Sequence, residues 1–298
     1  MGVRAALKRE ADWLEFFDHL GDVFMARFME PLWSKYPDRD SEEWSALSIF
    51  LEGYAFERQG RNPSFGPAAA KVAMSLRAQR YVFHQQSVAQ DVWRGFKKEL
   101  VNRGLNEVNN PLCPNAENFG KSRDKSVSGQ SIVELLMKMT QPNIVLYTKA
   151  GLKQDDARKL HEELGQVNGV GPKIISLWLR DVALAYHIVP ATENRHLLQP
   201  IDVWVRRTVE LIGKPYGPNG SPPSQNPARD KAIAWWIVQQ SHKAGFNAEK
   251  VNQGMWYFAS QVAGSEHRLT GAMHEAGIAE TLLDKHGQAL RSAVAALG

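Results

Sequence analysis

Two side chains near the middle of the chain combine residue type and setting in a way that could support covalent chemistry. Lys173 directly follows a Gly-Val-Gly-Pro turn (169–172), and Asp202 stands just before an amphipathic run with Val205 and Val209 inside. A lysine amine can act as a nucleophile and form a Schiff base, and a carboxylate can stabilise a developing positive charge. Each residue also has an ordinary explanation: Lys173 as a solvated surface lysine, and Asp202 as a helix N-cap worth about 1 kcal/mol.

The turn before Lys173 predicts a helix–turn–helix hairpin. Leu164 and Val167 close one helix, residues 168–171 form the turn, and Pro172 takes the favoured first position of the next helix. Glycines at 169 and 171 permit positive φ and close backbone approach, so the turn can bind an anion at a helix N-terminus. The dinucleotide pattern G-x-G-x-x-G fails because its third glycine would be Ile174, and no G-x-x-x-x-G-K is present. An ordinary helix–helix turn remains an alternative to phosphate binding.

The helix that follows this turn has an unusual outer face. At about 100° per residue, the apolar stripe is formed by Ile174, Ile175, Trp178, Leu179 and Val182. Lys173 falls nearly opposite that stripe, and Leu177, Arg180 and Leu184 share its face. Two leucines on an outer face indicate that a second surface or a cleft covers it, although a lysine opposite a core stripe is usually solvated.

The remaining chain indicates an all-α protein. Apolar residues recur at three- and four-residue steps near the N-terminus, at Leu14, Phe17, Leu20, Phe24 and Phe28, and no alternating strand pattern occurs. A second helix is expected to begin after Ser41 as its cap. Two polar stretches rich in Asn, Pro and Gly, 106–129 and 214–230, are expected to be long loops inserted in one fold.

Composition narrows the class of protein. A net charge of +4 and a pI near 9.1 permit an anionic partner without requiring one. A single cysteine, Cys113, excludes an internal disulfide, a four-thiolate iron–sulfur cluster and a cysteine-rich zinc site, and the nine histidines show no metal-ligand spacing. The N-terminus lacks a signal-peptide run and "AIAWWIV" is too short to cross a bilayer, so we expect a soluble, cytoplasmic protein, nucleoid-associated if the source is prokaryotic.

The hairpin and the aspartate together resemble a known superfamily. "VNGVGPK" (167–173) followed by "PIDVWVRR" (200–207) is similar to the helix-hairpin-helix (HhH-GPD) DNA glycosylases, which combine an L-P-G-V-G-x-K hairpin with a later [VI]-D-x-H/W motif. Asn168 replaces the usual proline, and the inserted stretch "VPATENRHLLQ" (189–199) lengthens the spacing between Lys173 and Asp202. The lack of the four cysteines that an iron–sulfur cluster needs places the pattern nearest the 8-oxoguanine DNA glycosylase/AP lyases without such a cluster.

The resemblance implies a fold, a reaction and a partner. It implies two helical lobes, 42–186 with the hairpin at about 160–186, and 1–41 plus 187–298, with the active site in the cleft between them. Lys173 would attack the sugar C1′ and form a Schiff base, and Asp202 would stabilise the cationic sugar. The backbone of Asn168, Gly169, Val170 and Gly171 would bind the phosphates of double-stranded DNA containing a damaged base. The protein would act as a monomer with no cofactor or metal, apart from a structural monovalent cation that some relatives hold at the hairpin.

The same resemblance implies where the base would bind. Gln253 would face the Watson–Crick edge of the extruded base, Tyr257 would stack on it, and Leu177 would form the floor of the pocket. Gln59, and next Asn62, would fill the gap left in the duplex. A buried helix that only fills the core explains the segment around Tyr257 almost as well.

Three functions therefore remain open from the sequence. The first is a base-excision repair glycosylase with AP lyase activity for an oxidised purine. The second is a glycosylase of the same fold for another damaged or modified base, in repair or in defence. The third is a non-catalytic helix-hairpin-helix protein that binds DNA, against which the presence of both Lys173 and Asp202 argues.

Overall fold

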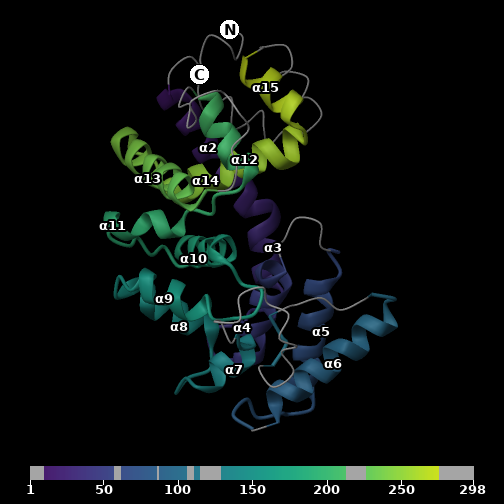
Figure 1. Cartoon of the computed structure of the whole chain (residues 1–298). Coiled ribbons are helices and arrows are strands. Elements are labelled where there is room, and N and C mark those ends of the chain that lie inside the picture. Colours follow the sequence, from purple (N-terminus) through teal and green to yellow (C-terminus); the bar gives the residue numbers. More distant parts are fainter. Residues whose placement is uncertain are drawn as a thin grey trace. The chain divides into compact units, whose positions relative to one another are not determined.

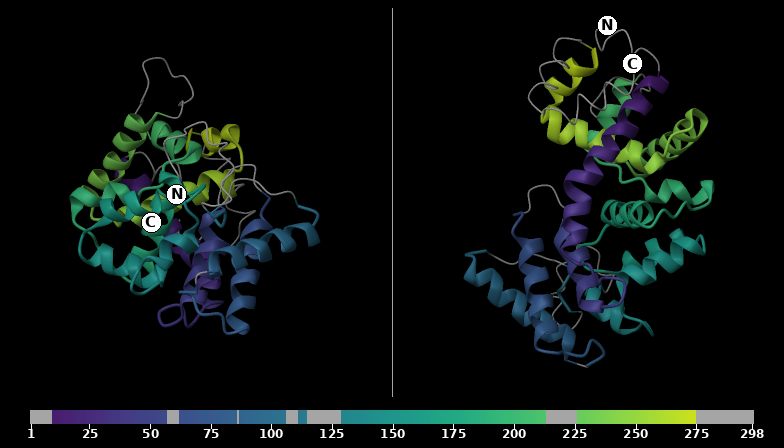
Figure 2. Two further views of the ribbon diagram at one scale, coloured as in Figure 1. Left: turned by 60° about the horizontal axis from the view of Figure 1, so that its bottom comes forward. Right: turned by 180° about the vertical axis from the view of Figure 1, so that it is seen from behind.

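The computed structural model is mostly helical in the part of the chain that it describes, residues 10–56, 62–85, 87–105, 111–114, 129–212 and 226–274 (Figures 1 and 2). No strand occurs among these residues; one isolated parallel bridge pairs Gln130 with Val167. The prediction of an all-α protein is thus confirmed. None of the described helices is both long and apolar enough to cross a bilayer.

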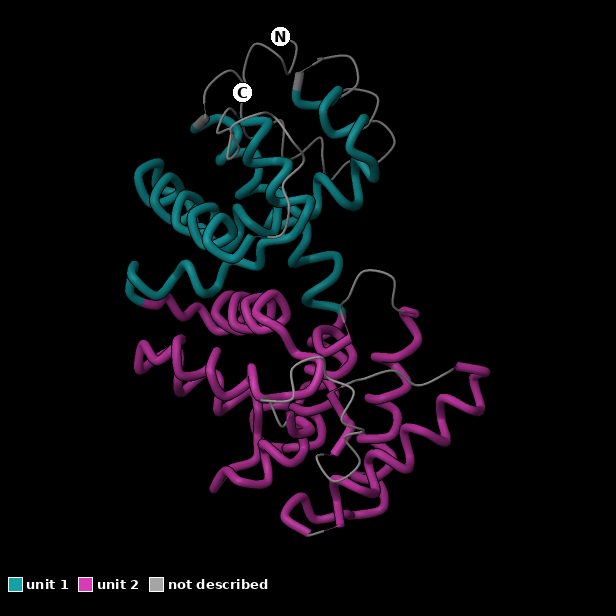
Figure 3. Tube along the Cα trace, in the orientation of Figure 1, with its two compact units in different colours: residues 1–31, 191–298 teal, residues 32–190 magenta. Residues whose placement is uncertain are grey.

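The chain divides into two compact units, residues 1–31 with 191–298 (unit 1) and residues 32–190 (unit 2), coloured separately in Figure 3. The sequence predicts lobe boundaries at 41/42 and 186/187. In the structure the first boundary lies ten residues earlier, at 31/32, and the second lies four residues later, at 190/191. Residues 32–41 join unit 2 because Trp33 stacks on Trp178 at 6.0 Å between ring centroids and donates to the hydroxyl of Tyr54.

Unit 1 is built around two helices that pack closely. Its helices are α2 (Glu10–Phe24), the π-helical turn η1 (Met25–Met29), α11 (Thr192–Arg195), the 3-10 turn η4 (His196–Leu198), α12 (Val203–Leu211), α13 (Pro227–Ala244), α14 (Ala248–Tyr257), the π-helical turn η5 (Phe258–Ala263) and α15 (Glu266–His274). α14 lies along α2, and glycines allow the close approach: a Cβ at Gly254 would overlap the carbonyl oxygen of Phe17, and one at Gly21 would overlap that of Lys250. α3 (Glu30–Ser34) contains the boundary between the units.

The π-helical turn η1 changes which apolar residues are buried. Leu14, Phe17 and Leu20 lie in the core, as the three- and four-residue steps predict. Phe28 is 45% exposed, so the expectation that it continues the buried stripe is wrong. The π turn widens the helical repeat between Met25 and Met29, which turns Phe28 outward and buries Met29 instead.

Unit 2 carries the predicted hairpin. Its helices are α4 (Glu43–Phe50), the π-helical turn η2 (Leu51–Ala55), α5 (Phe65–Ala78), α6 (Val88–Asn102), α7 (Ile132–Met137), α8 (Ile144–Lys153), α9 (Ala157–Leu164) and α10 (Pro172–Ala185). Glu42, rather than Ser41, caps α4, because its carboxylate accepts the backbone N–H of Ser45. α7 begins with a capping box between Ser131 and Glu134.

The two predicted loops fall largely outside the described residues. Of 106–129, only 111–114 and Gly129 are described, and they contain no helix. The expected loop at 214–230 extends too far, because α13 already begins at Pro227, with Asn226 as its N-cap. Asn-Pro is therefore a helix start here rather than part of a turn.

Candidate functional site

The hairpin forms as predicted, and one of its two glycines, Gly169, uses the positive φ that glycine permits. α9 ends at Leu164, Gly169 has a φ of +75°, and Gly171 is extended, with φ −97° and ψ 175°, before α10 starts. Pro172, which has no N–H, is the first residue of α10, and Lys173 is the second and is exposed. The positive end of the α10 dipole therefore lies at the turn, beside the lysine.

Asn168 anchors the turn to a distant part of the chain. It is buried, and its side-chain amide donates to the carbonyl oxygens of Cys113 at 3.0 Å and Gly129 at 3.3 Å. Its backbone N–H donates to the Gln130 carbonyl at 2.9 Å, beside the bridge between Gln130 and Val167. The asparagine that departs from the family pattern thus holds the hairpin in place, and its side chain faces inward. Val170 is also buried, so among 168–171 only the two glycines are partly exposed.

Trp178 fixes α10 in the core of unit 2. Its ring is buried against Trp33, Phe50 and Tyr54, with centroids 6.0, 5.3 and 5.0 Å away, and its indole N–H donates to Thr148 at 2.8 Å. The helix that carries Lys173 is therefore anchored in the core about one and a half turns beyond the lysine.

The outer face of α10 is largely covered, as its leucines predict. Leu184 is buried, Leu177 is half-buried, and Arg180 is buried with its Nε 2.8 Å from the carboxylate of Asp181. Only Lys173, at the start of this face, is exposed. Leu177 lies one turn along α10 from the lysine.

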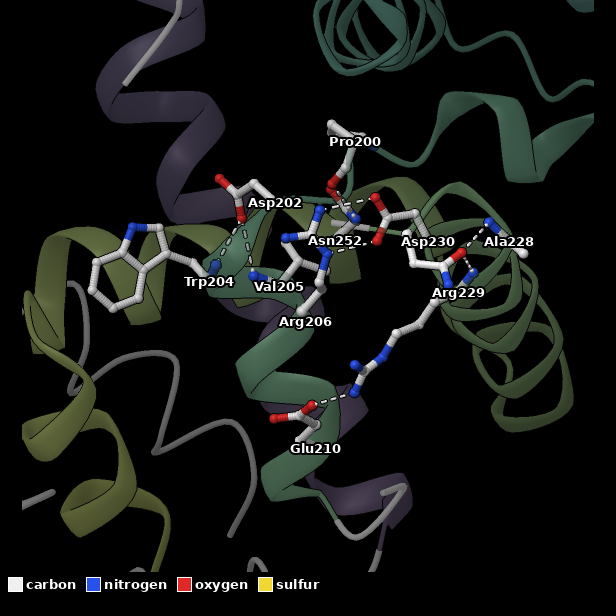
Figure 4. Close-up of polar contacts among 11 residues, drawn as sticks. Pro200, Asp202, Trp204, Val205, Arg206, Glu210, Ala228, Arg229, Asp230 and Asn252 are labelled. Carbon is white, nitrogen blue, oxygen red and sulfur yellow. Dashed lines mark hydrogen bonds and ion pairs between the residues drawn. The ribbon is translucent and has the colours of Figure 1, made fainter. Parts of the chain in front are cut away.

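Asp202 is the N-cap of α12 and accepts three hydrogen bonds. Its Oδ1 accepts the backbone N–H groups of Trp204 at 3.0 Å and Val205 at 3.1 Å (Figure 4). Its Oδ2 accepts the indole N–H of Trp256 at 3.1 Å. These contacts orient both carboxylate oxygens, so the structure gives Asp202 a firmly held position as well as the capping role that the sequence allows.

One face of α14 holds the inserted segment that leads to Asp202. The guanidinium of Arg195 forms a two-pronged, buried ion pair with Glu249, and the amide of Gln199 donates to the same carboxylate at 3.3 Å. One turn further along α14, the side chain of Asn252 donates to the Pro200 carbonyl at 3.3 Å. The insertion is thus folded into α11 and η4 and tied to α14 before the chain reaches Asp202.

Ion pairs tie α12 to α13 on the other side. Arg206 contacts the carboxylate of Asp230 through two hydrogen bonds of 2.6 and 2.8 Å, and Arg229 contacts Glu210 at 2.7 Å (Figure 4). The hydrogen bonds that the buried Arg206 guanidinium donates to Asp230 raise its pKa. α14 therefore contacts the carboxylate at the start of α12, and α13 contacts the helix further along its length.

The two residues expected to contact a base are both buried in unit 1. Gln253 is fully buried, and Tyr257 is 1% exposed with its hydroxyl accepting from Arg27 at 3.0 Å. The Tyr257 ring lies 6.3 Å from that of Phe24 and 5.7 Å from that of Phe28. With these rings against it and only 1% of its surface exposed, Tyr257 offers no open ring face on which a base could stack in this structure.

Of the two residues expected to enter the duplex, only Asn62 lies in the described part of the chain. Gln59 lies outside the described residues. Asn62 is exposed, and its side-chain oxygen accepts the Ser64 N–H at 2.9 Å, so it forms a local turn just before α5.

The candidate residues form two sets. Lys173, Leu177 and the hairpin belong to unit 2, and Asp202, Gln253 and Tyr257 belong to unit 1. No role was predicted for Glu249, Asn252 and Trp256, which contact Asp202 and the segment before it. Their spacing of three and four residues is a helical-face signal that could have grouped them. In the described part of the chain, no three His, Cys, Asp or Glu side chains are placed to hold a metal ion.

Comparison with known proteins identifies no family. No protein-family model and no solved structure matches the chain. A protein of Methanocaldococcus jannaschii described as "Uncharacterized protein MJECL21" is 21% identical over 216 residues, which cover 68% of this chain and 49% of that protein. The chain thus spans about half the length of the curated relative that it matches.

Proposed function

We propose that this protein is a helix-hairpin-helix DNA glycosylase with AP lyase activity that excises an oxidised purine through a Schiff base on Lys173. The observation that carries the proposal is the hairpin: an exposed lysine at the first turn of α10, directly after a Gly-Val-Gly turn, on a helix anchored by Trp178. The two-lobed glycosylase fold, with units 1 and 2 as its lobes, is part of this proposal.

In this proposal, DNA is bound through contacts between the hairpin backbone and phosphate groups rather than through contacts with bases. The partly exposed Gly169 and Gly171 allow a phosphate to approach the backbone at the positive end of α10. Such contacts position the duplex without reading its sequence. The net charge of +4 is compatible with this partner.

The proposed chemistry uses one nucleophile and one carboxylate. The neutral amine of Lys173 attacks the sugar C1′, the bond from C1′ to the base nitrogen breaks, and the base leaves with the electron pair and takes up a proton. The bond from C1′ to the ring oxygen then opens to give the imine. Loss of a proton from C2′ breaks the C3′–O bond and nicks the strand, and water releases Lys173. The carboxylate of Asp202 stabilises the cationic sugar while the base departs.

Borohydride trapping tests the proposal directly. Duplexes carrying one 8-oxoguanine, one abasic site or neither would be incubated with wild type and Lys173→Gln, with borohydride present. An adduct on the 8-oxoguanine duplex that is absent with Lys173→Gln supports the proposed activity and base.

The other outcomes distinguish the alternatives. An adduct on the abasic duplex alone keeps Lys173 as the nucleophile and assigns the enzyme to another base, to be found with a panel of damaged and modified bases. If neither duplex is trapped while both are bound with a steep dependence on salt, the protein is a non-catalytic DNA-binding protein and the proposal is refuted.

A further inference from the structure

Asp202 is positioned by a side chain of α14 that no sequence pattern assigns. The carboxylate must satisfy donors on two sides: the first N–H groups of α12 at Oδ1 and the Trp256 indole at Oδ2. The backbone contacts hold Oδ1, and the indole contact holds Oδ2, so the two sets of donors together orient the carboxylate.

Trp256 is the last of three contacts that one face of α14 makes with the incoming chain. Glu249, Asn252 and Trp256 contact Arg195, Pro200 and Asp202 in the same order along both segments. Since these α14 residues are three and four positions apart, they share a face of the helix. The helix and the inserted segment therefore run together for the whole distance up to the carboxylate.

The packing of α14 makes this arrangement rigid. Gly254 lies so close to α2 that a Cβ would overlap the Phe17 carbonyl, and the Trp256 ring packs edge-on against Phe24 at 5.8 Å. The indole N–H is thus presented from a helix that has little room to shift.

We infer that Trp256 is a positioning residue for Asp202: its indole N–H holds the carboxylate in the orientation in which it stabilises the cationic sugar. This inference rests on the proposed function. It assigns Trp256 no contact with the reacting atoms, so it differs from the base-contacting roles expected of its neighbours Gln253 and Tyr257. A positioning group raises the rate of the chemical step and leaves DNA binding unchanged.

Trp256→Phe is the most informative change because it keeps an aromatic ring against Phe24 and removes only the N–H donor. The matched control is Trp235→Phe, which removes an indole N–H from another half-buried tryptophan of unit 1 whose ring stacks on His196. We expect Trp256→Phe to lower the single-turnover excision rate about tenfold with DNA affinity within about twofold, and the control to change neither.

A double-mutant cycle with Asp202→Asn separates positioning from general damage. If Trp256 acts through Asp202, adding Trp256→Phe to Asp202→Asn produces no further loss of rate. The inference is refuted, while the proposed function stands, if Trp256→Phe lowers the rate equally in wild type and in Asp202→Asn. It is also refuted if Trp256→Phe alone is as active as wild type. If wild type neither excises a base nor forms an imine, the proposed function fails, and the catalytic role of Trp256 fails with it.

The hydrogen bond between Trp256 and Asp202 can also be tested without measuring enzyme activity. An asparagine offers one acceptor oxygen, so at 202 it can cap α12 but then turns its NH₂ group toward the indole. We expect Asp202→Asn to shift the indole proton resonance of Trp256 more than those of the other eight tryptophans in nitrogen–proton correlation spectra of the full chain. An unmoved Trp256 resonance overturns the assigned contact whatever the enzyme does.

Discussion

The buried ion pair between Arg195 and Glu249 gives the sharpest test of how unit 1 holds the segment before Asp202. Glu249→Gln keeps the size of the side chain and removes its charge. Arg195 and Glu249 are 9% and 4% exposed at their side chains, so the variant leaves a guanidinium buried without its counter-charge. It also weakens the acceptor of the Gln199 amide.

The expected cost is large for one substitution. Breaking a buried pair by removing one partner costs about 3–5 kcal/mol, compared with a total stability of about 5–15 kcal/mol for a domain. Because each kcal/mol lowers the Tm of a domain of this size by about 2–4 °C, the Tm should fall by roughly 6–20 °C. Urea and thermal unfolding followed by circular dichroism would measure it.

The neighbouring residue supplies a matched control. Lys250, also on α14, pairs with Asp22 at 2.5 Å, but the two side chains are 29% and 52% exposed. Exposed pairs contribute about 0–1 kcal/mol, so Lys250→Gln should be nearly neutral. The double variant Arg195→Met, Glu249→Met should recover part of the loss, since it removes both buried charges. If Glu249→Gln costs no more than Lys250→Gln, the ion pair does not hold the segment and the reasoning is refuted.

Three further predictions concern the packing and the charges. Asn168→Ala should cost about 1–3 kcal/mol in urea unfolding, because it leaves the carbonyl groups of residues 113 and 129 without their amide donor; a neutral result would remove the anchor assigned to the hairpin. Gly254→Ala should destabilise by about 1–3 kcal/mol despite a better helix propensity, whereas Gly171→Ala, whose Cβ would meet nothing within 4 Å, should change stability little; equal effects would contradict the close packing of α14 on α2. Burial alone raises the pKa of Asp40, but hydrogen bonds from Lys149 and Tyr186 outweigh it and lower that pKa below its ordinary value of 3.8. The resulting stability is present above that value and is lost as pH falls through the lowered one, so the difference in Tm between wild type and Asp40→Asn should shrink below about pH 4 and would be constant if the contact contributed nothing.

Local sequence determined the parts of this protein whose physics is local. Apolar residues at helical spacing predicted the buried stripe of α10, and the Gly-Val-Gly-Pro run predicted the hairpin turn. Asp202 marked the start of α12. Each of these features depends on neighbours within one or two helical turns. The sequence also identified an outer face of α10 that is largely covered, from two leucines in otherwise polar positions.

Tertiary packing decided the rest. The inward role of Asn168 depends on a carbonyl group 55 residues earlier, and the orientation of Asp202 depends on an indole 54 residues later, and neither distance leaves a pattern in the chain. The exposure of Phe28 follows from a π turn, and Gln253 is fully buried on a helix, α14, that packs closely against α2. Periodicity reports which face of a helix is apolar, whereas only the packed structure determines which polar groups on that helix find partners and which side chains remain open to a ligand.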